Sequence, residues 1–73
     1  MSRLPQLSGW EAVRAFERDG WDLVRQCGSH AVLTKPGSIV TLSVPLHDRL
    51  GRGLLHDLIR KAGLTPEEFL ELL

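Results

Sequence analysis

Three histidines stand singly along the chain, at His30, His47 and His56, and carry the chemistry that is easiest to use at neutral pH. Imidazole takes up and releases a proton near neutrality, so a histidine can act as a general acid or a general base. Cleavage of an RNA phosphodiester needs one such group to activate the ribose 2′-hydroxyl and another to protonate the leaving oxygen. It also needs a cation to stabilise the charge that builds on the phosphate.

His30 follows Gly28 and Ser29, so a residue that permits a tight turn, a hydroxyl and an imidazole stand next to one another. An exposed histidine on a strand is more often solvated surface than a catalytic group, and these residues alone leave both alternatives open. His47 comes in a loop after a predicted strand, where it either bonds a nearby carbonyl or serves in proton transfer or phosphate contact. We expect His56 on the solvated face of a predicted helix.

The basic residues nearest to this proposed site are Arg25 and Lys35, which are candidates for holding a phosphate group. A looser basic cluster consists of Arg49, Arg52, Arg60 and Lys61. Basic residues in this number are common on the surface of any soluble protein, so the cluster needs no functional explanation. Trp10 and Trp21 can stack on nucleobases, but their positions beside a predicted helix and strand favour roles in the core or in a hydrophobic staple.

The sequence offers no set of metal ligands. Its acidic residues are spread along predicted helices and turns, with Glu67 and Glu68 used at a helix start, and no pair is placed to bind two metal ions. The histidines and the single cysteine, Cys27, lack zinc-site spacing, and a phosphate-binding glycine loop with a lysine is missing. We therefore predict that any nuclease activity needs no metal or other cofactor, and that Cys27 is an inert thiol.

Length and charge limit the class of protein. The 73 residues predict one domain, residues 1–73, held by apolar packing because a single cysteine excludes an intramolecular disulfide. Nine basic residues balance nine acidic ones, so contact with a nucleic acid requires a local patch rather than an overall positive field. Residues 1–7 lack the apolar stretch of a signal peptide and no run reaches membrane-spanning length, which predicts a cytoplasmic protein without membrane contact.

A helix that ends at Gly20 is predicted to open the fold. Ser8 and Glu11 form the pattern of a capping box, with Ser8 as the N-cap. The apolar residues at helical spacing are Trp10, Val13 and Phe16, widened by Ala12 and Ala15. Gly20 suits a left-handed cap at the end of this helix.

Three short strands are predicted next, over residues 21–26, 29–35 and 38–44. Tight turns at 27–28 and 36–37 join them, which predicts an antiparallel meander.

Alternation along the strands decides which residues face the core. The inward set that we predict is Ala31, Leu33, Val40, Leu42 and Val44. This choice puts His30, Val32 and Thr34 on the opposite face, and Pro45 closes the third strand. His30 then stands near the start of a strand on an uncovered, partly polar surface.

Two helices complete the fold after a loop over residues 46–53. The apolar face of the first is formed by Leu55, Leu58, Ile59 and Ala62. Gly53 serves as its N-cap and Gly63 ends it, while Thr65 and Glu68 form a second capping box that starts a short terminal helix. The sequence thus predicts an α+β fold in the order helix, three-stranded antiparallel meander, helix, short C-terminal helix, with the helices on one sheet face.

Several segments, in order along nearly the whole chain, form a recognisable series. They are Leu4-Pro5-Gln6-Leu7-Ser8-Gly9, Gly20-Trp21, Val24-Arg25-Gln26, Gly28-Ser29-His30, Val44-Pro45-Leu46-His47, Arg60-Lys61-Ala62-Gly63-Leu64 and Glu67-Glu68-Phe69. In this order they resemble the HicA family of toxins, and the whole series is far more specific than any one motif.

The resemblance implies a fold similar to double-stranded RNA-binding domains and a translation-independent endoribonuclease that cleaves single-stranded messenger RNA. It also implies that His30 is the catalytic residue, that Gly28 and Ser29 shape the approach to it, and that His47 is an accessory residue. A HicB-type antitoxin that blocks the active site is the partner implied for the whole protein.

Two other functions remain open on the same scaffold. One is a non-catalytic module that binds double-stranded RNA by its shape. The other is an interaction protein whose open sheet face docks a partner, with Val24 and Val32 in the contact. The neutral charge argues against the RNA-binding module more than against an enzyme, because turnover tolerates weak binding.

Overall fold

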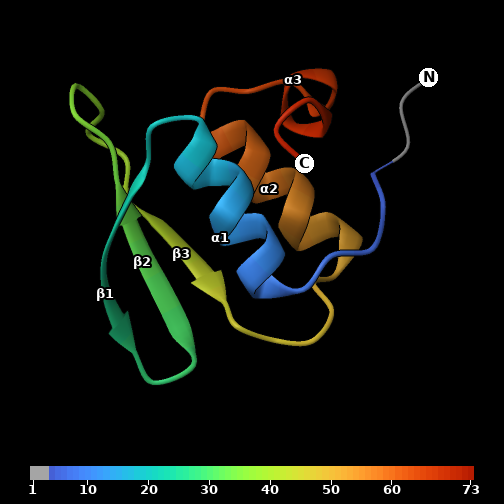
Figure 1. Ribbon diagram of the computed structural model, residues 1–73, viewed down its shortest axis with the longest axis horizontal. Coiled ribbons are helices and arrows are strands. Elements are labelled where there is room, and N and C mark those ends of the chain that lie inside the picture. Colours follow the sequence, from blue (N-terminus) through green and yellow to red (C-terminus); the bar gives the residue numbers. More distant parts are fainter. Residues whose placement is uncertain (1–3) are drawn as a thin grey trace.

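A helix, a three-stranded sheet and two further helices follow one another in the structure, a computed structural model that describes residues 4–73 (Figure 1). The elements are α1 (Gly9–Arg18), β1 (Asp22–Cys27), β2 (His30–Thr34), β3 (Leu42–Pro45), α2 (Arg52–Lys61) and α3 (Pro66–Leu70). The sheet order is β1-β2-β3 and both pairings are antiparallel, so the predicted α+β order and meander are confirmed. The start of the predicted domain, at residues 1–3, lies outside the described residues.

Helix α1 begins and ends as its sequence predicts. The N–H of Glu11 donates to Ser8 Oγ at 3.2 Å and the N–H of Ser8 donates to Glu11 Oε1 at 2.9 Å, which completes the capping box. Gly20 follows the helix with a φ of +98°, a conformation that favours glycine. The buried side of the helix consists of Ala12, Val13, Ala15 and Phe16.

The expectation that both tryptophans are core or staple residues holds for one of them. Trp21 is 2% exposed, whereas Trp10 is 43% exposed. Trp10 is the second residue of α1, and the two positions of a hydrophobic staple on this helix belong instead to Leu7 and Ala12, both buried. The predicted inward role of Trp10 is therefore wrong, because the helix buries only the remainder of the apolar stripe.

The hairpin between β1 and β2 turns one residue later than predicted. Cys27 is the last residue of β1 and pairs with His30, so the two turn residues are Gly28 and Ser29. Gly28 has a φ of +58° and Ser29 has no positive φ, the pattern of a type II′ hairpin turn with glycine first.

Strand β3 is shorter at its start and longer at its end than predicted. It begins at Leu42 rather than Ser38, because the backbone N–H of Val40 donates to Ser38 Oγ at 3.1 Å within a local turn. It ends at Pro45, which pairs with His30 instead of lying beyond the strand. Proline is tolerated there because β3 is an edge strand and needs no N–H on its outer side.

The helices cover one face of the sheet, as predicted. Figure 1 shows α1 and α2 together beside the strands, and α1 contacts β1 and β3 while α2 contacts β3. The fully buried strand residues are Ala31, Leu33, Leu42 and Val44, and the helical residues above them include Phe16, Leu55, Leu58 and Ile59. All of these residues belong to one hydrophobic core, in which the rings of Phe16 and Phe69 lie 5.1 Å apart.

Helix α2 starts two residues earlier than predicted. Its N-cap is Gly51, not Gly53, which lies inside the helix. The preceding residue, Leu50, is buried, and its N–H donates to the carbonyl oxygen of Leu7 at 2.7 Å. This anchor fixes the end of the loop, so the helix begins directly after it.

The C-terminal helix matches its prediction closely. The N–H of Glu68 donates to Thr65 Oγ1 at 3.1 Å and the N–H of Thr65 donates to Glu68 Oε1 at 2.8 Å. Within residues 4–73, none of the helices has the length and apolar character required to cross a membrane.

Candidate functional site

His30 is the first residue of β2 and is exposed. The next residue, Ala31, is fully buried under the helices, and since strand residues alternate between faces, His30 points to the uncovered face. Its partners in the register are Cys27 on β1 and Pro45 on β3. Both partners are uncharged, and side chains directly opposite one another lie about 5 Å apart at their Cβ atoms.

The turn before His30 is fastened on two sides. The N–H of Leu46 donates to the carbonyl oxygen of Ser29 at 2.6 Å, and the side-chain amide of Gln26 donates to the carbonyl oxygen of Gly28 at 3.0 Å. These bonds hold the backbone on which the imidazole of His30 stands. Gly28 and Ser29 therefore sit where the sequence places them, directly beside His30 at the tip of the hairpin.

His47 lies at the same end of the sheet as His30. It is exposed and follows Pro45, the strand partner of His30, by two residues. Its carbonyl oxygen accepts a hydrogen bond of 2.9 Å from the N–H of Gly9, the first residue of α1. This hydrogen bond joins the loop after β3 to the start of α1, so the backbone of His47 is held at the end of the sheet where His30 lies.

Gly9 is a residue whose importance the sequence does not reveal. A Cβ atom at this position would lie 2.1 Å from the carbonyl oxygen of Pro45 and 2.7 Å from the Cα of Leu46. Only glycine lets the start of α1 approach the end of β3 so closely. The sole signal in the sequence is a glycine directly after the N-cap Ser8, where a helix has no conformational need of one.

Arg25 is the cation that the fold brings to the same face as His30. It pairs with Val32, which is the next residue of β2 on the open face after His30. Residues in this diagonal relation have Cβ atoms about 7–8 Å apart, within reach of a long side chain. Arg25 is exposed and, among the described residues, makes no ion pair.

A β-bulge interrupts the pairing of β1 with β2. The register shifts between Leu23 and Arg25, so that Leu23 lies opposite the buried Leu33 while Arg25 stays opposite Val32 on the open face. Val24, the extra residue, is 53% exposed. Every residue of β1 is exposed, so the bulge adds one more exposed residue to the strand while Arg25 keeps its place on the open face.

Lys35 is not brought to His30. It follows the last residue of β2, five positions from His30, and a strand rises about 3.3 Å per residue, so roughly 16 Å separate them. Its Nζ lies 3.2 Å from Asp19 Oδ2 and 5.9 Å from the ring centre of Trp21. Lys35 thus belongs to a cluster with Asp19 and Trp21 at the opposite end of the sheet.

The remaining candidates lie elsewhere. His56 is exposed on α2, as predicted, and Cys27 is a free exposed thiol. On the same helix the pKa of Asp57 is lowered, first by a hydrogen bond from Arg60 and then by the charge of Lys61. In the part of the chain that the structure describes, no three His, Cys, Asp or Glu side chains are grouped to hold a metal ion.

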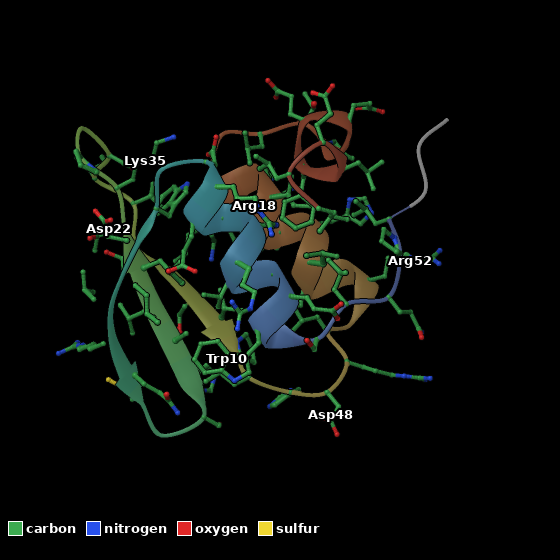
Figure 2. All side chains as sticks on the ribbon, viewed as in Figure 1. Trp10, Arg18, Asp22, Lys35, Asp48 and Arg52 are labelled. Atoms are coloured by element: carbon green, nitrogen blue, oxygen red, sulfur yellow. The ribbon has the colours of Figure 1, made fainter. Side chains whose placement is uncertain are left out.

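One exposed end of the sheet, to which we refer as the His30 end, is formed by His30 together with Ser29, Arg25 and His47. It offers an imidazole for proton transfer, a second imidazole near it and a guanidinium that can bind a phosphate oxygen. Figure 2 shows Trp10 at the same end of the molecule, where β3 stops.

Comparison with known proteins gives one family. Residues 9–64 match the protein-family model described as "HicA toxin of bacterial toxin-antitoxin", a stretch that contains every residue of the His30 end. The comparison with curated proteins gives no match.

Proposed function

Because the chain belongs to the HicA family of toxins of bacterial toxin-antitoxin systems, we propose that it is an endoribonuclease that cleaves single-stranded messenger RNA with His30 as its catalytic residue. The observation that carries this proposal is the position of His30. Its imidazole is exposed on the face of the sheet that the helices leave uncovered, next to Arg25 and on the same edge as His47.

The reaction requires the transfer of two protons. A base removes the proton of the ribose 2′-hydroxyl, the 2′-oxygen attacks the neighbouring phosphorus, and the bond from phosphorus to the 5′-oxygen breaks as an acid protonates that oxygen. The products are a 2′,3′-cyclic phosphate and a 5′-hydroxyl. His30 serves as the base or the acid of this reaction, with His47 as the accessory imidazole.

The charge that builds on the phosphate in the transition state needs a partner. Arg25 is placed to supply it, because its guanidinium shares the open face with His30 and is not engaged by a carboxylate among residues 4–73. Ser29 and Gly28 hold the backbone before His30 through their two carbonyl hydrogen bonds. Positioning of this kind is what keeps a catalytic group at a fixed distance from its substrate.

The partner of a toxin in such a system is its antitoxin. We expect an antitoxin of HicB type that covers the open face, since that surface carries the exposed Val24 and the half-buried Val32 beside His30. An antitoxin seated there would exclude RNA from the imidazole. The cytoplasm, where messenger RNA is translated, is the compartment that this function requires.

The experiment that tests cleavage uses pure protein, single-stranded RNA and EDTA. We expect fragments that end in a 2′,3′-cyclic phosphate and begin with a 5′-hydroxyl, and no cleavage where the nucleotide at that position is 2′-deoxy. Intact RNA in a stable complex with excess protein would contradict the proposal and favour a non-catalytic RNA-binding module. Intact RNA without a complex would favour a protein-interaction module.

In cells, induction of the wild-type chain should arrest growth and induction of His30→Ala should not. Equal amounts of folded protein in both cultures are the necessary control. Arrest by the His30→Ala protein at the same level would show that His30 is not the catalytic residue.

A further inference from the structure

Four aromatic side chains occur in the sequence, and three of them are buried. Phe16 and Phe69 are fully buried and Trp21 is 2% exposed, whereas Trp10 is 43% exposed. Trp10 is thus the aromatic side chain whose ring face is open to a ligand, and an indole combines a large apolar surface with a polar N–H.

The local structure of α1 does not require a tryptophan at this position. The capping box uses Ser8 and Glu11, and the staple positions are held by Leu7 and Ala12. Trp21 donates its indole N–H to Asp19 Oδ2 at 3.2 Å, while the indole of Trp10 makes no hydrogen bond with any residue from 4 to 73. Trp10 thus makes neither the core packing nor the side-chain hydrogen bond that Trp21 makes.

The backbone next to Trp10 is fixed against the end of the sheet. Gly9 donates to the carbonyl oxygen of His47, and a Cβ at Gly9 would lie 2.1 Å from the carbonyl oxygen of Pro45, the strand partner of His30. Figure 2 shows the Trp10 side chain at this end, beside the tip of β3. The exposed indole of Trp10, at the start of α1, therefore stands at the same end of the sheet as His30 and His47.

We infer that Trp10 is a platform on which one nucleobase of the RNA substrate stacks, beside the phosphodiester at which His30 transfers a proton. The inference rests on the proposed function and adds a determinant of substrate binding to it. Every nucleobase has a π-face, so an exposed indole binds single-stranded RNA without requiring a particular base.

The neutral charge of the chain favours such a platform. Nine basic residues are balanced by nine acidic ones, so the overall field does not attract a polyanion. Stacking does not depend on net charge and is weakened little by salt. It supplies affinity that a basic surface would otherwise provide, and a base held on Trp10 fixes the register of the next phosphate.

The test compares Trp10→Leu with Trp10→Phe. Loss of one stacked base weakens binding roughly 5- to 150-fold, so Trp10→Leu should raise KM by such a factor with kcat within about twofold of wild type. Trp10→Phe should lie between the two. Circular dichroism and thermal melting serve as folding controls, and because Trp10 is half-exposed both variants should fold.

An abasic substrate separates stacking from a structural effect. RNA that lacks the base on one side of the cleaved bond should raise the KM of wild type by the same factor as Trp10→Leu, and should raise the KM of Trp10→Leu no further. Independent, multiplicative losses for abasic RNA on either side would overturn the inference. So would an unchanged KM for Trp10→Leu when wild type cleaves normally, a result that leaves the proposed function intact.

Fluorescence keeps the inference testable even if no RNA is cleaved. Single-stranded 2′-O-methyl RNA lacks the attacking hydroxyl, and its binding should quench the emission of wild type but not that of Trp10→Phe, whose only indole is the buried Trp21. Quenching without cleavage of ordinary RNA would support the platform and contradict the nuclease. Absence of quenching would overturn the inference that Trp10 is a platform. A Trp10→Leu protein that loses binding to the antitoxin but binds RNA normally would overturn it as well.

Discussion

The two ends of the sheet contain similar side chains in opposite states. At one end Trp21 is buried and donates to Asp19, which also accepts from Lys35, and the ammonium of Lys35 lies over the indole ring. At the His30 end an indole, a guanidinium and two imidazoles are exposed.

Structural and functional polar residues of a small domain differ in whether other side chains of the domain already bind them. A cation and a tryptophan that satisfy one another stabilise the fold and are not free for a ligand. Side chains of the same kinds that gather on an uncovered surface without partners contribute little to stability and are available to bind RNA.

Replacement of the two tryptophans should give the largest difference in the free energy of unfolding. Trp21→Ala should lower the free energy of unfolding by about 3–5 kcal/mol, because it removes a buried ring and leaves a cavity. Trp10→Ala should lower it by about 1 kcal/mol or less, since much of that ring is already in water. Urea denaturation of both variants measures this, and equal losses would show that the two ends do not differ in this way.

Gly9→Ala should come next, with a loss of about 1–3 kcal/mol, since its methyl group has no space beside the carbonyl oxygen of Pro45. Gly53→Ala is the matched control: a Cβ there meets nothing within 4 Å, and alanine in a helix should stabilise by about 0.5–1 kcal/mol. Thermal melting of both proteins gives the comparison. A Gly9→Ala protein as stable as wild type would refute the close approach of α1 to β3.

The smallest effects come from the two cations. Arg25→Ala should slow RNA cleavage roughly tenfold, as expected for loss of one charged hydrogen bond, and leave the melting temperature unchanged. Lys35→Ala should do the reverse, with normal cleavage and a loss of about 0.5–1 kcal/mol, because its ion pair with Asp19 is partly screened by solvent. Slower cleavage by Lys35→Ala, together with normal cleavage by Arg25→Ala, would show that Lys35 and not Arg25 binds the phosphate.

Local signals made much of this fold predictable. Two helix starts are predicted by capping boxes, formed by Ser8 with Glu11 and by Thr65 with Glu68. Two helix ends are predicted by Gly20 and Gly63. The alternation of residues around His30 predicts the face of the sheet on which it lies. Each of these features is determined by residues a few positions apart, so a sequence read in short windows contains them.

The errors arose where tertiary contacts decide. The pairing of Pro45 with His30 extends β3 past a residue that usually ends a strand. The start of α2 follows from the anchoring of Leu50 on Leu7. Neither partner of these contacts reveals the other in the sequence.

The candidate site was predictable in part for the same reason. The sequence places Gly28, Ser29 and His30 together because they are consecutive, but it cannot tell that Arg25 shares their face while Lys35 is held by Asp19 at the far end. Helical spacing likewise does not show where the buried stripe stops, which is why Trp10 was expected inside.

The proposed role of His30 is to transfer a proton from its exposed imidazole during cleavage of RNA. The most direct measurement is the single-turnover cleavage rate of a single-stranded RNA, with enzyme in excess and EDTA present, for His30→Ala and for His56→Ala, which removes an exposed imidazole on α2. We predict that His30→Ala is slower than wild type by roughly 10²–10⁴-fold, at an unchanged melting temperature, and that His56→Ala equals wild type. A folded His30→Ala protein that cleaves at the wild-type rate would show that this imidazole takes no part in the reaction.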